Sequence, residues 1–297
     1  DFVKRLHQVA GELGAEPRFD GEAGDGFPLI GEVLHGDYNL IVNDEMLDSC
    51  TNYECYKGLY SSFNSMNMFE IAHSLHRQFG GDPWCIYRGK HLVSFADNHD
   101  VTRLASILTC TEHLRGAYGV LFGMPGIPCL YYGSEWGQLG QKGTGYLADV
   151  EIRPQLDAPA ADALEHLAAG WEGGGAPNQL TAYICELNHV RRASRALCHG
   201  TYRNVVITNK QLLFERDAAA EGEQAPERVL VAVNAEDCPF TLNDGTLNGR
   251  FEVLLASAPC ADDPNAAPDY PQTGDLLELE GSLTLLPYGV MYLRRTM

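Results

Sequence analysis

The sequence predicts an α/β unit of parallel strands joined by helices, followed by an all-β module folded as an antiparallel sandwich. Over residues 1–197, short apolar runs alternate with segments of helical periodicity, as in consecutive strand–helix–strand units. Beyond residue 197 the helical period disappears, and short β-rich runs are separated by Asn, Asp and Gly turns. We therefore expect two domains, 1–199 and 200–297.

The elements of the first domain follow from the spacing of its apolar residues. Apolar side chains recur every three or four positions over 2–13 and end at Gly14, which predicts an amphipathic helix. A longer helical pattern covers 56–79 and ends at a Gly-Gly-Asp-Pro turn. The expected strands are 27–32, 47–49, 91–97 and 127–132, and the other expected helices are 111–122, 161–170 and 178–197.

The second domain is predicted from short runs of β-branched and other apolar residues. None of these runs continues at a helical period, so an antiparallel sandwich fits them better than helices do. An acidic insert at 215–228 and a Pro/Asp-rich loop at 258–274 are expected on the surface. The β-rich runs are 205–207, 212–214, 229–234, 251–255, 276–279 and 290–293.

The charge and the cysteines restrict partners and compartment. The chain has 21 basic and 40 acidic residues and a net charge of −19, which argues against binding to nucleic acid or to an anionic membrane. No apolar run reaches the roughly 18 residues that a membrane span needs. The 9 cysteines are irregularly spaced and include no Cys-x-x-Cys pair, so we expect a reducing cytoplasm. No signal-peptide pattern is present, and secretion stays an alternative if residues precede Asp1.

Two acidic residues each follow a buried apolar strand. Glu32 follows the run Phe-Pro-Leu-Ile at 27–30, and Asp100 follows the strand 91–97. Because parallel strands deliver their carboxyl ends to one rim, we expect both carboxylates at the same site. Glycosidic-bond cleavage uses such a pair, with one group as the proton donor and the other ionised. The simpler interpretation places Glu32 on the surface and Asp100 as the cap of a following helix.

Three motifs, in this order, resemble segments of the α-amylase family of glycoside hydrolases. Residues 31–37, Gly-Glu-Val-Leu-His-Gly-Asp, resemble the proton-donor segment on the fifth barrel strand, and 95–100, Phe-Ala-Asp-Asn-His-Asp, resemble the segment on the seventh. Residues 126–135, Gly-Ile-Pro-Cys-Leu-Tyr-Tyr-Gly-Ser-Glu, resemble the eighth-strand segment. The resemblance implies the second half of a (β/α)8 TIM-type barrel followed by an all-β antiparallel sandwich.

The chain departs from the family pattern at the nucleophile. The family's nucleophilic aspartate lies in a Gly-x-Arg-x-Asp segment on the fourth strand, and that pattern does not occur in this sequence. Residues 1–13 resemble the helix that follows it. We therefore expect an upstream segment or a partner chain to complete the barrel, and we expect these residues alone to be inactive. The intact parent would be a retaining hydrolase acting on α-1,4-linked glucans and maltooligosaccharides.

The resemblance also assigns roles to individual side chains. It makes Glu32 the general acid and base and Asp100 the residue that stabilises the transition state. Each expected substrate-binding residue has a structural alternative, such as shaping a loop, pairing with an acid across the rim, or packing in the core. No metal or cofactor is assigned, since calcium in this family mostly involves the inserted domain that this sequence lacks. The expected substrate-binding residues are His99, Asn98, His35, Asp37, Arg103, Tyr131 and Glu135.

Other functions use the same residues. A transglycosylase, a branching enzyme or a sucrose phosphorylase of the same family would carry the same pair of acids. A non-catalytic carbohydrate-binding or scaffolding homologue is the alternative from another class, although the presence of both Glu32 and Asp100 argues against it. A separate carbohydrate-binding module at 200–297 lacks an evident platform of aromatic residues.

Overall fold

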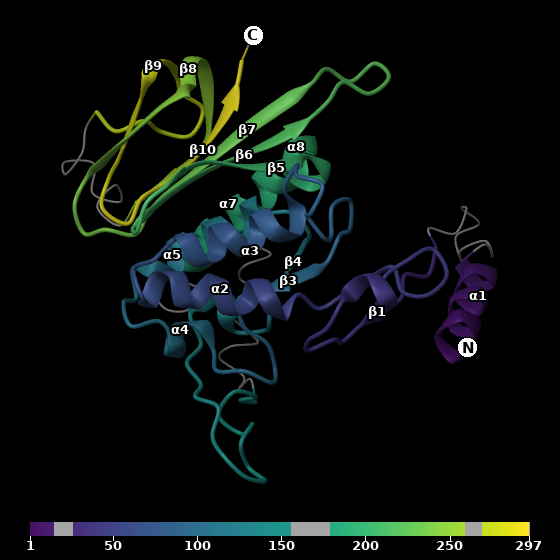
Figure 1. The fold of residues 1–297 in the computed structure, drawn as a ribbon. Coiled ribbons are helices and arrows are strands. Elements are labelled where there is room, and N and C mark those ends of the chain that lie inside the picture. Colours follow the sequence, from purple (N-terminus) through teal and green to yellow (C-terminus); the bar gives the residue numbers. More distant parts are fainter. Residues whose placement is uncertain (15–25, 156–178, 259–268, 297) are drawn as a thin grey trace.

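The structure, a computed structural model, describes residues 1–14, 26–155, 179–258 and 269–296 (Figure 1). A layer of helices lies between a strip of short parallel strands and a six-stranded antiparallel sheet. The helix expected at 161–170 lies outside the described residues. Within the described ranges, no helix is long and apolar enough to cross a membrane.

Four short strands form the parallel strip. β1 (Ile30–Gly31) pairs with β2 (Ser49–Cys50), and β3 (Val93–Phe95) pairs with β4 (Ile127–Cys129), both in parallel. A parallel bridge between Thr51 and Val93 joins the two pairs, so the spatial order follows the chain. All carboxyl ends therefore point to the same rim. The α/β character is confirmed, but the strands are shorter than the apolar runs that predict them, because only their central residues pair.

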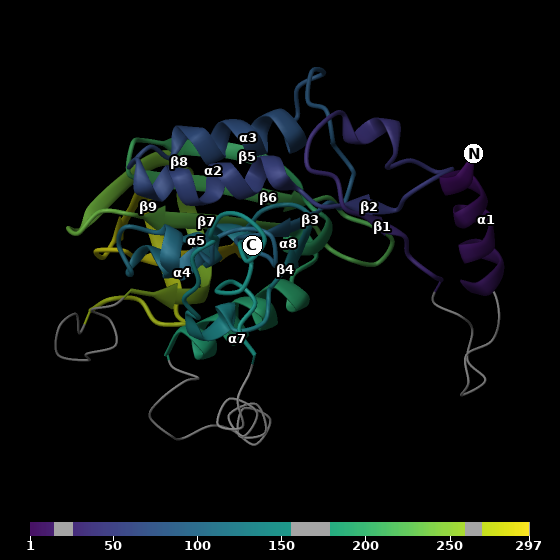
Figure 2. The same ribbon diagram turned by 90° about the horizontal axis from the view of Figure 1, so that it is seen from below.

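The helices between residues 53 and 199 pack their apolar faces against one core, whereas the helix at residues 2–14 lies apart from them (Figure 2). The expected helix at 56–79 is in fact two helices, because the chain turns back at Met66, whose φ is +50°. This turn lets Phe63 and Ile71 from the two helices enter the same core. The expected helix at 178–197 is likewise divided at Ser194, which caps the second part through its hydroxyl. The helices are α1 (Phe2–Gly14), α2 (Tyr53–Asn64), α3 (Phe69–Phe79), α4 (Leu104–Ile107), α5 (His113–Gly123), α7 (Gln179–Ala193) and α8 (Arg195–His199), with 3-10 turns η1 (Tyr38–Leu40) and η2 (Ser134–Trp136).

The last part of the chain forms one antiparallel sheet with the strand order β5-β6-β7-β10-β8-β9. A second apolar cluster, which includes Leu247 and Phe251, covers its other face, as expected for a β-sandwich. The acidic insert expected on the surface spans 215–228. This expectation is wrong for its first residues, because Glu215 and Arg216 belong to β6 and are buried. The strands are β5 (Thr201–Ile207), β6 (Gln211–Ala218), β7 (Glu227–Asn234), β8 (Phe240–Ser257), β9 (Leu276–Leu285) and β10 (Val290–Arg295).

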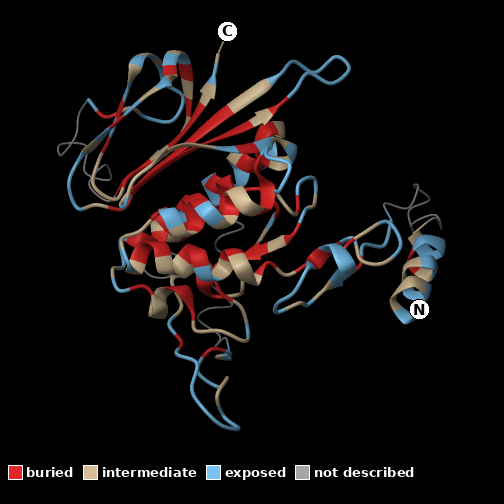
Figure 3. Ribbon diagram, viewed as in Figure 1, coloured by how far each residue is buried: buried red, intermediate tan, exposed pale blue. Residues whose placement is uncertain are grey.

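Helix α5 joins the helical layer to the sheet through glycines on one face. A Cβ atom added to Gly119 would lie 2.8 Å from Val290 Cγ1, and one added to Gly123 would lie 2.9 Å from Phe214 Cζ. The hydroxyl of Tyr292 in β10 donates a hydrogen bond to the carbonyl oxygen of Gly119 at 2.5 Å. The helices and the near face of the sheet therefore share one continuous core, and Figure 3 colours much of both in the red of buried residues.

Candidate functional site

Three polar side chains converge at the carboxyl ends of β1 and β3. Glu32 follows β1, and His99 and Asp100 follow β3. One ligand-type atom from each of these side chains lies within 4.8 Å of the other two. Glu32 and His99 are exposed, and Asp100 is partly exposed, so all three can be reached from solvent. The structure therefore brings together the two acids and the histidine that the strand ends predict.

Tyr53 connects the two strand ends. Its hydroxyl donates a hydrogen bond to Glu32 Oε1 at 3.1 Å and accepts one from Asn98 Nδ2 at 3.0 Å. The backbone N–H of Asp100 donates to Asn98 Oδ1 at 2.9 Å, which orders the turn that carries the second acid. Burial raises the pKa of Tyr53, so its hydroxyl keeps its proton and remains a donor. Tyr53 is not among the site residues expected from the sequence, although it begins α2 directly after Asn52, which caps that helix.

Basic side chains from a distant loop surround Asp100. Arg153 Nη2 lies 2.7 Å from Asp100 Oδ1 and 2.8 Å from Asp149 Oδ2, and its Nε donates to the carbonyl oxygen of His99 at 2.8 Å. Lys142 Nζ donates to the carbonyl oxygen of Asp100 at 2.5 Å. These cations offset the negative charge that two neighbouring carboxylates bring to the rim. Arg153 carried no signal in the sequence, because its segment has neither periodicity nor a motif.

Arg103 lies outside the cluster of Glu32, His99 and Asp100, and its expected role in substrate binding stays a prediction. The side chain is fully buried below the rim. It donates hydrogen bonds to the carbonyl oxygens of Ile152 at 3.0 Å and Tyr132 at 2.6 Å, and to Ser134 Oγ at 3.0 Å. Its guanidinium carbon lies 4.0 Å from the centre of the Tyr131 ring. Arg103 therefore has a clear structural role, because it holds the loops after β3 and β4 together.

A buried acid lies beside that arginine. Asp97 accepts hydrogen bonds from the backbone N–H of Leu104 at 2.7 Å and from Ser134 Oγ at 2.7 Å. Burial raises the pKa of Asp97, while these donors and the charge of Arg103 act in the opposite direction. Asp97 thus supports the segment that presents Asn98, His99 and Asp100, and it is itself 3% exposed.

Tyr131 and Glu135 lie on the loop that follows β4. The ring centre of Tyr131 is 6.3 Å from that of His99, so the tyrosine lies next to the cluster, with Arg103 over its ring. Glu135 is half-buried at η2, and burial raises the pKa of its carboxyl group. Sugar binding by these two residues stays a prediction.

His35 and Asp37 lie in the loop after β1, outside the cluster of Glu32, His99 and Asp100. The Asp37 carboxylate accepts hydrogen bonds from the backbone N–H and the side-chain amide of Asn39, both at 3.0 Å, and so caps η1. His35 lines an open cavity of about 590 Å³ that also includes Tyr53 and Arg77. Their expected role in substrate binding therefore stays a prediction, and Asp37 has a clear structural role.

The same rim offers ligand atoms for a metal ion. Glu32, His99 and Asp100 are close enough to hold one, but the carboxylate of Asp100 is already paired with Arg153. The expectation that the site uses no metal stays a prediction. A second group of metal-type ligands, outside the rim, consists of His76, Asp82 and Cys85.

Comparison with known proteins supports the motif resemblance. No family model matches the chain. A segment of 109 residues is 33% identical to Alpha-amylase 1 of Schizosaccharomyces pombe, and the match covers 36% of this chain and 17% of that protein.

Solved structures match almost the whole chain. An Anoxybacillus α-amylase superposes with a TM-score of 0.69 and 18% identity, covering 100% of this chain and 56% of the other. The E221Q variant of AmyP, solved in complex with maltotriose, superposes with a TM-score of 0.69 and 16% identity, covering 98% of this chain and 60% of the other. At these low identities the superpositions show likeness of fold alone, and this chain spans little more than half the length of either protein.

Proposed function

We propose that this chain, a partial homologue of α-amylase-family glycoside hydrolases, supplies the acid/base part of a retaining enzyme acting on α-1,4-linked glucans and maltooligosaccharides. The observation that supports this best is the convergence of Glu32 and Asp100, from different strands, within 4.8 Å and beside His99. These two carboxyl groups match the proton donor and its ionised partner in glycosidic-bond cleavage, and the nucleophile is a third group. The binding of maltotriose by AmyP supports a glucan as the substrate.

In this proposal Glu32 is the general acid and then the general base. Because Tyr53 donates to Glu32 Oε1, we assign the transferable proton to the other oxygen, Oε2. Asp100, whose carboxylate pairs with Arg153, stabilises the positive charge that develops on the sugar ring. His99 and Asn98 bind sugar hydroxyls next to it.

The nucleophile belongs to a segment outside these residues in our proposal. Within the described ranges, β1 and β4 each pair with a strand on one side only. Ile30 in β1 is 56% exposed and Ile127 in β4 is 44% exposed, whereas strands of a closed parallel barrel are covered on both faces. We therefore propose that the strip is the second half of a (β/α)8 barrel, within a domain at 1–199, and that an upstream segment or partner chain completes it. The sheet is proposed as a separate domain at 200–297.

The test is hydrolysis of maltooligosaccharides by this chain and by a form extended with its upstream coding sequence. We expect activity in the extended form only. E32Q should lower kcat by about 10²–10⁴-fold, the usual contribution of a general acid–base group. E45Q is the matched control, because Glu45 is exposed on the same segment and pairs with Lys4. Full activity in the E32Q variant, or hydrolysis by this chain alone, would contradict the proposal.

Product analysis in the same assay separates hydrolysis from transfer. Free maltooligosaccharides shorter than the substrate indicate a hydrolase, and longer or branched products indicate a transglycosylase or branching enzyme. Tight maltotriose binding with no turnover in the extended form would instead indicate a carbohydrate-binding homologue.

A further inference from the structure

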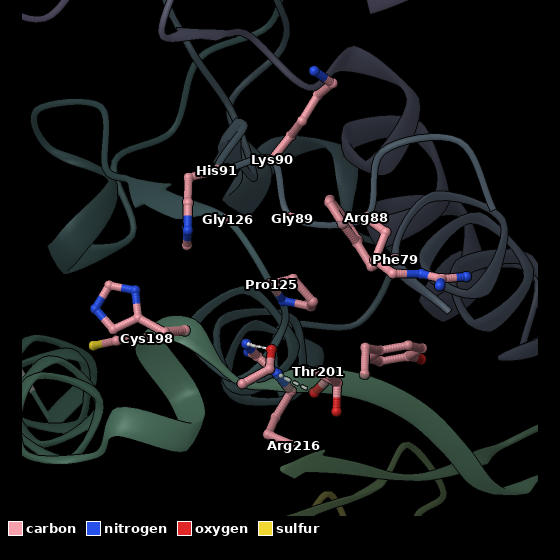
Figure 4. Close-up of a pocket in the computed structure, with 13 residues that line it drawn as sticks. Phe79, Arg88, Gly89, Lys90, His91, Pro125, Gly126, Cys198, Thr201 and Arg216 are labelled. Carbon is pink, nitrogen blue, oxygen red and sulfur yellow. Dashed lines mark hydrogen bonds between the residues drawn. The ribbon is translucent and has the colours of Figure 1, made fainter. Parts of the chain in front are cut away.

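A small cavity lies at the end of β3 and β4 opposite to the rim that carries Glu32 and Asp100 (Figure 4). Its volume is about 160 Å³. His91, just before β3, and Gly126, just before β4, line one side, and Thr201 at the start of β5 lines the other. The cavity therefore lies between the parallel strip and the six-stranded sheet, away from the proposed glucan site.

The charge of this cavity is opposite to that of the chain. Five basic residues line it, and none of its lining residues is acidic. The chain as a whole has a net charge of −19. A local excess of positive charge in an acidic protein attracts anions to that point on the surface. The basic residues are Arg88, Lys90, His91, His199 and Arg216.

The floor of the cavity carries a buried positive charge without a carboxylate partner. Arg216 is 1% exposed and Arg191, behind it, is 5% exposed. Within the described ranges, neither forms an ion pair, and their N–H groups donate to backbone carbonyl oxygens such as that of Gly123, at 2.7 Å from Arg216 Nη1. Burial and the charge of Arg191 both lower the pKa of Arg216. Carbonyl dipoles only partly replace a counter-ion, so the positive potential of this pair reaches the cavity.

Two histidines stand at the mouth of the cavity. The rings of His91 and His199 lie 5.5 Å apart at 75° to each other, and both residues are exposed. Figure 4 shows His91 directed into the cavity, above Thr201 and Arg216. Lys90 and Arg88 point away, and they donate to the carbonyl oxygens of Val42 and Gly80 at 2.5 and 3.0 Å. The imidazoles, not these longer side chains, are therefore the groups able to contact a ligand.

We propose that this cavity binds a small tetrahedral oxyanion, as inorganic phosphate or as the phosphate group of a phosphorylated sugar, between the imidazoles of His91 and His199 and the Arg216 guanidinium. The anion supplies the counter-ion that Arg216 and Arg191 lack in the protein. Imidazole and guanidinium N–H groups are the donors that phosphate oxygens accept in charge-assisted hydrogen bonds. The oxyanion would thereby stabilise the junction between the helical layer and the sheet.

The first experiment is calorimetric titration of the full 297-residue chain with inorganic phosphate and with sulfate. We expect binding of both anions and at least tenfold weaker binding by the double variant H91Q/H199Q, which keeps neutral side chains of similar size at exposed positions. H189Q is the matched control, because His189 is exposed on α7 and outside the cavity. R216M should also abolish binding, and the histidine variant keeps the proposal testable if R216M does not fold. An unchanged dissociation constant in H91Q/H199Q, or no binding of either anion, overturns the proposal.

The second experiment uses pH with sulfate, whose own charge does not change near neutrality. Burial is the largest cause that lowers the pKa of His91. The positive charges of His199, Arg191 and Arg216 lower it further. A bound anion opposes those charges and favours protonation, so sulfate should bind more tightly at about pH 6 than at about pH 8. The H91Q/H199Q variant should lose this difference, and a difference that persists in it would refute the role of the histidines.

The source of the phosphate is decided by a third titration, with glucose 6-phosphate. Affinity equal to that for inorganic phosphate identifies the free ion, and at least tenfold tighter binding identifies a phosphorylated sugar. Either result supports the site. No glucan takes part in these titrations, so their outcome is independent of the proposed hydrolase function.

Discussion

Gly119 gives a quantitative test of how the helical layer meets the sheet. In an open helix, replacing Gly by Ala stabilises the protein by about 1 kcal/mol. At Gly119 the added Cβ would lie 2.8 Å from Val290 Cγ1 and 3.0 Å from Tyr183 Oη. Val290 is fully buried in β10 and, as a β-branched residue, has a stiff side chain. Overpacking of this kind costs about 1–3 kcal/mol.

A shift of α5 that relieved the clash would also strain the hydrogen bond from Tyr292 to the Gly119 carbonyl, which is worth about 1 kcal/mol. We therefore expect G119A to lower the free energy of unfolding by about 1–3 kcal/mol, after the helix gain is subtracted. Urea denaturation measures this. G11A is the control, because a Cβ there would meet nothing within 4 Å, and it should be neutral or stabilising. A double-mutant cycle with V290A should show coupling between the two sites. A G119A protein more stable than the wild type would refute the close packing of α5 on the sheet.

Three further predictions concern the rim. Y53F in the extended, active form should lower kcat/KM about tenfold, because Glu32 loses the donor that orients it, and steady-state kinetics that stay unchanged would exclude this role. R103M should destabilise the chain by about 3 kcal/mol in urea denaturation, because buried carbonyl groups lose a charged donor, whereas a change below about 1 kcal/mol would contradict its structural role. For Asp97, burial raises the folded-state pKa above the unfolded value, so the wild type loses stability as pH rises from the unfolded pKa through the folded one. D97N should remove that loss, and urea midpoints measured from about pH 4 to pH 7 would show an unaltered slope if the assignment is wrong.

Local patterns in the sequence were enough to place the main features of the rim. Glu32 and Asp100 follow short apolar runs, and parallel pairing alone brings such strand ends together. The change from helical to β-rich texture near residue 200 likewise predicts the observed start of β5 at Thr201. These features depend on neighbours in sequence, so a single chain contains the information.

The remaining features depend on contacts between distant positions. Arg153 meets Asp100 across 53 positions, and nothing near Arg153 in the sequence indicates this. Arg103 was expected at the rim because it follows Asp100 closely, but its side chain enters the core to satisfy carbonyl groups at Ile152 and Tyr132. The turn at Met66 interrupts a continuous helical pattern because two short helices bury more of their apolar faces than one straight helix can.

The contact between α5 and β10 has a consequence for synthesis on the ribosome. Gly119 and Tyr292 are separated by 173 positions, so the core that covers α5 closes only after β10 has been made. At about 5–20 residues per second, translation of that interval takes on the order of 10–35 s. Throughout this time the face of α5 that later meets Val290 lacks β10, the strand that covers it. We therefore expect the nascent helical layer to be a client of chaperones until the last strand emerges.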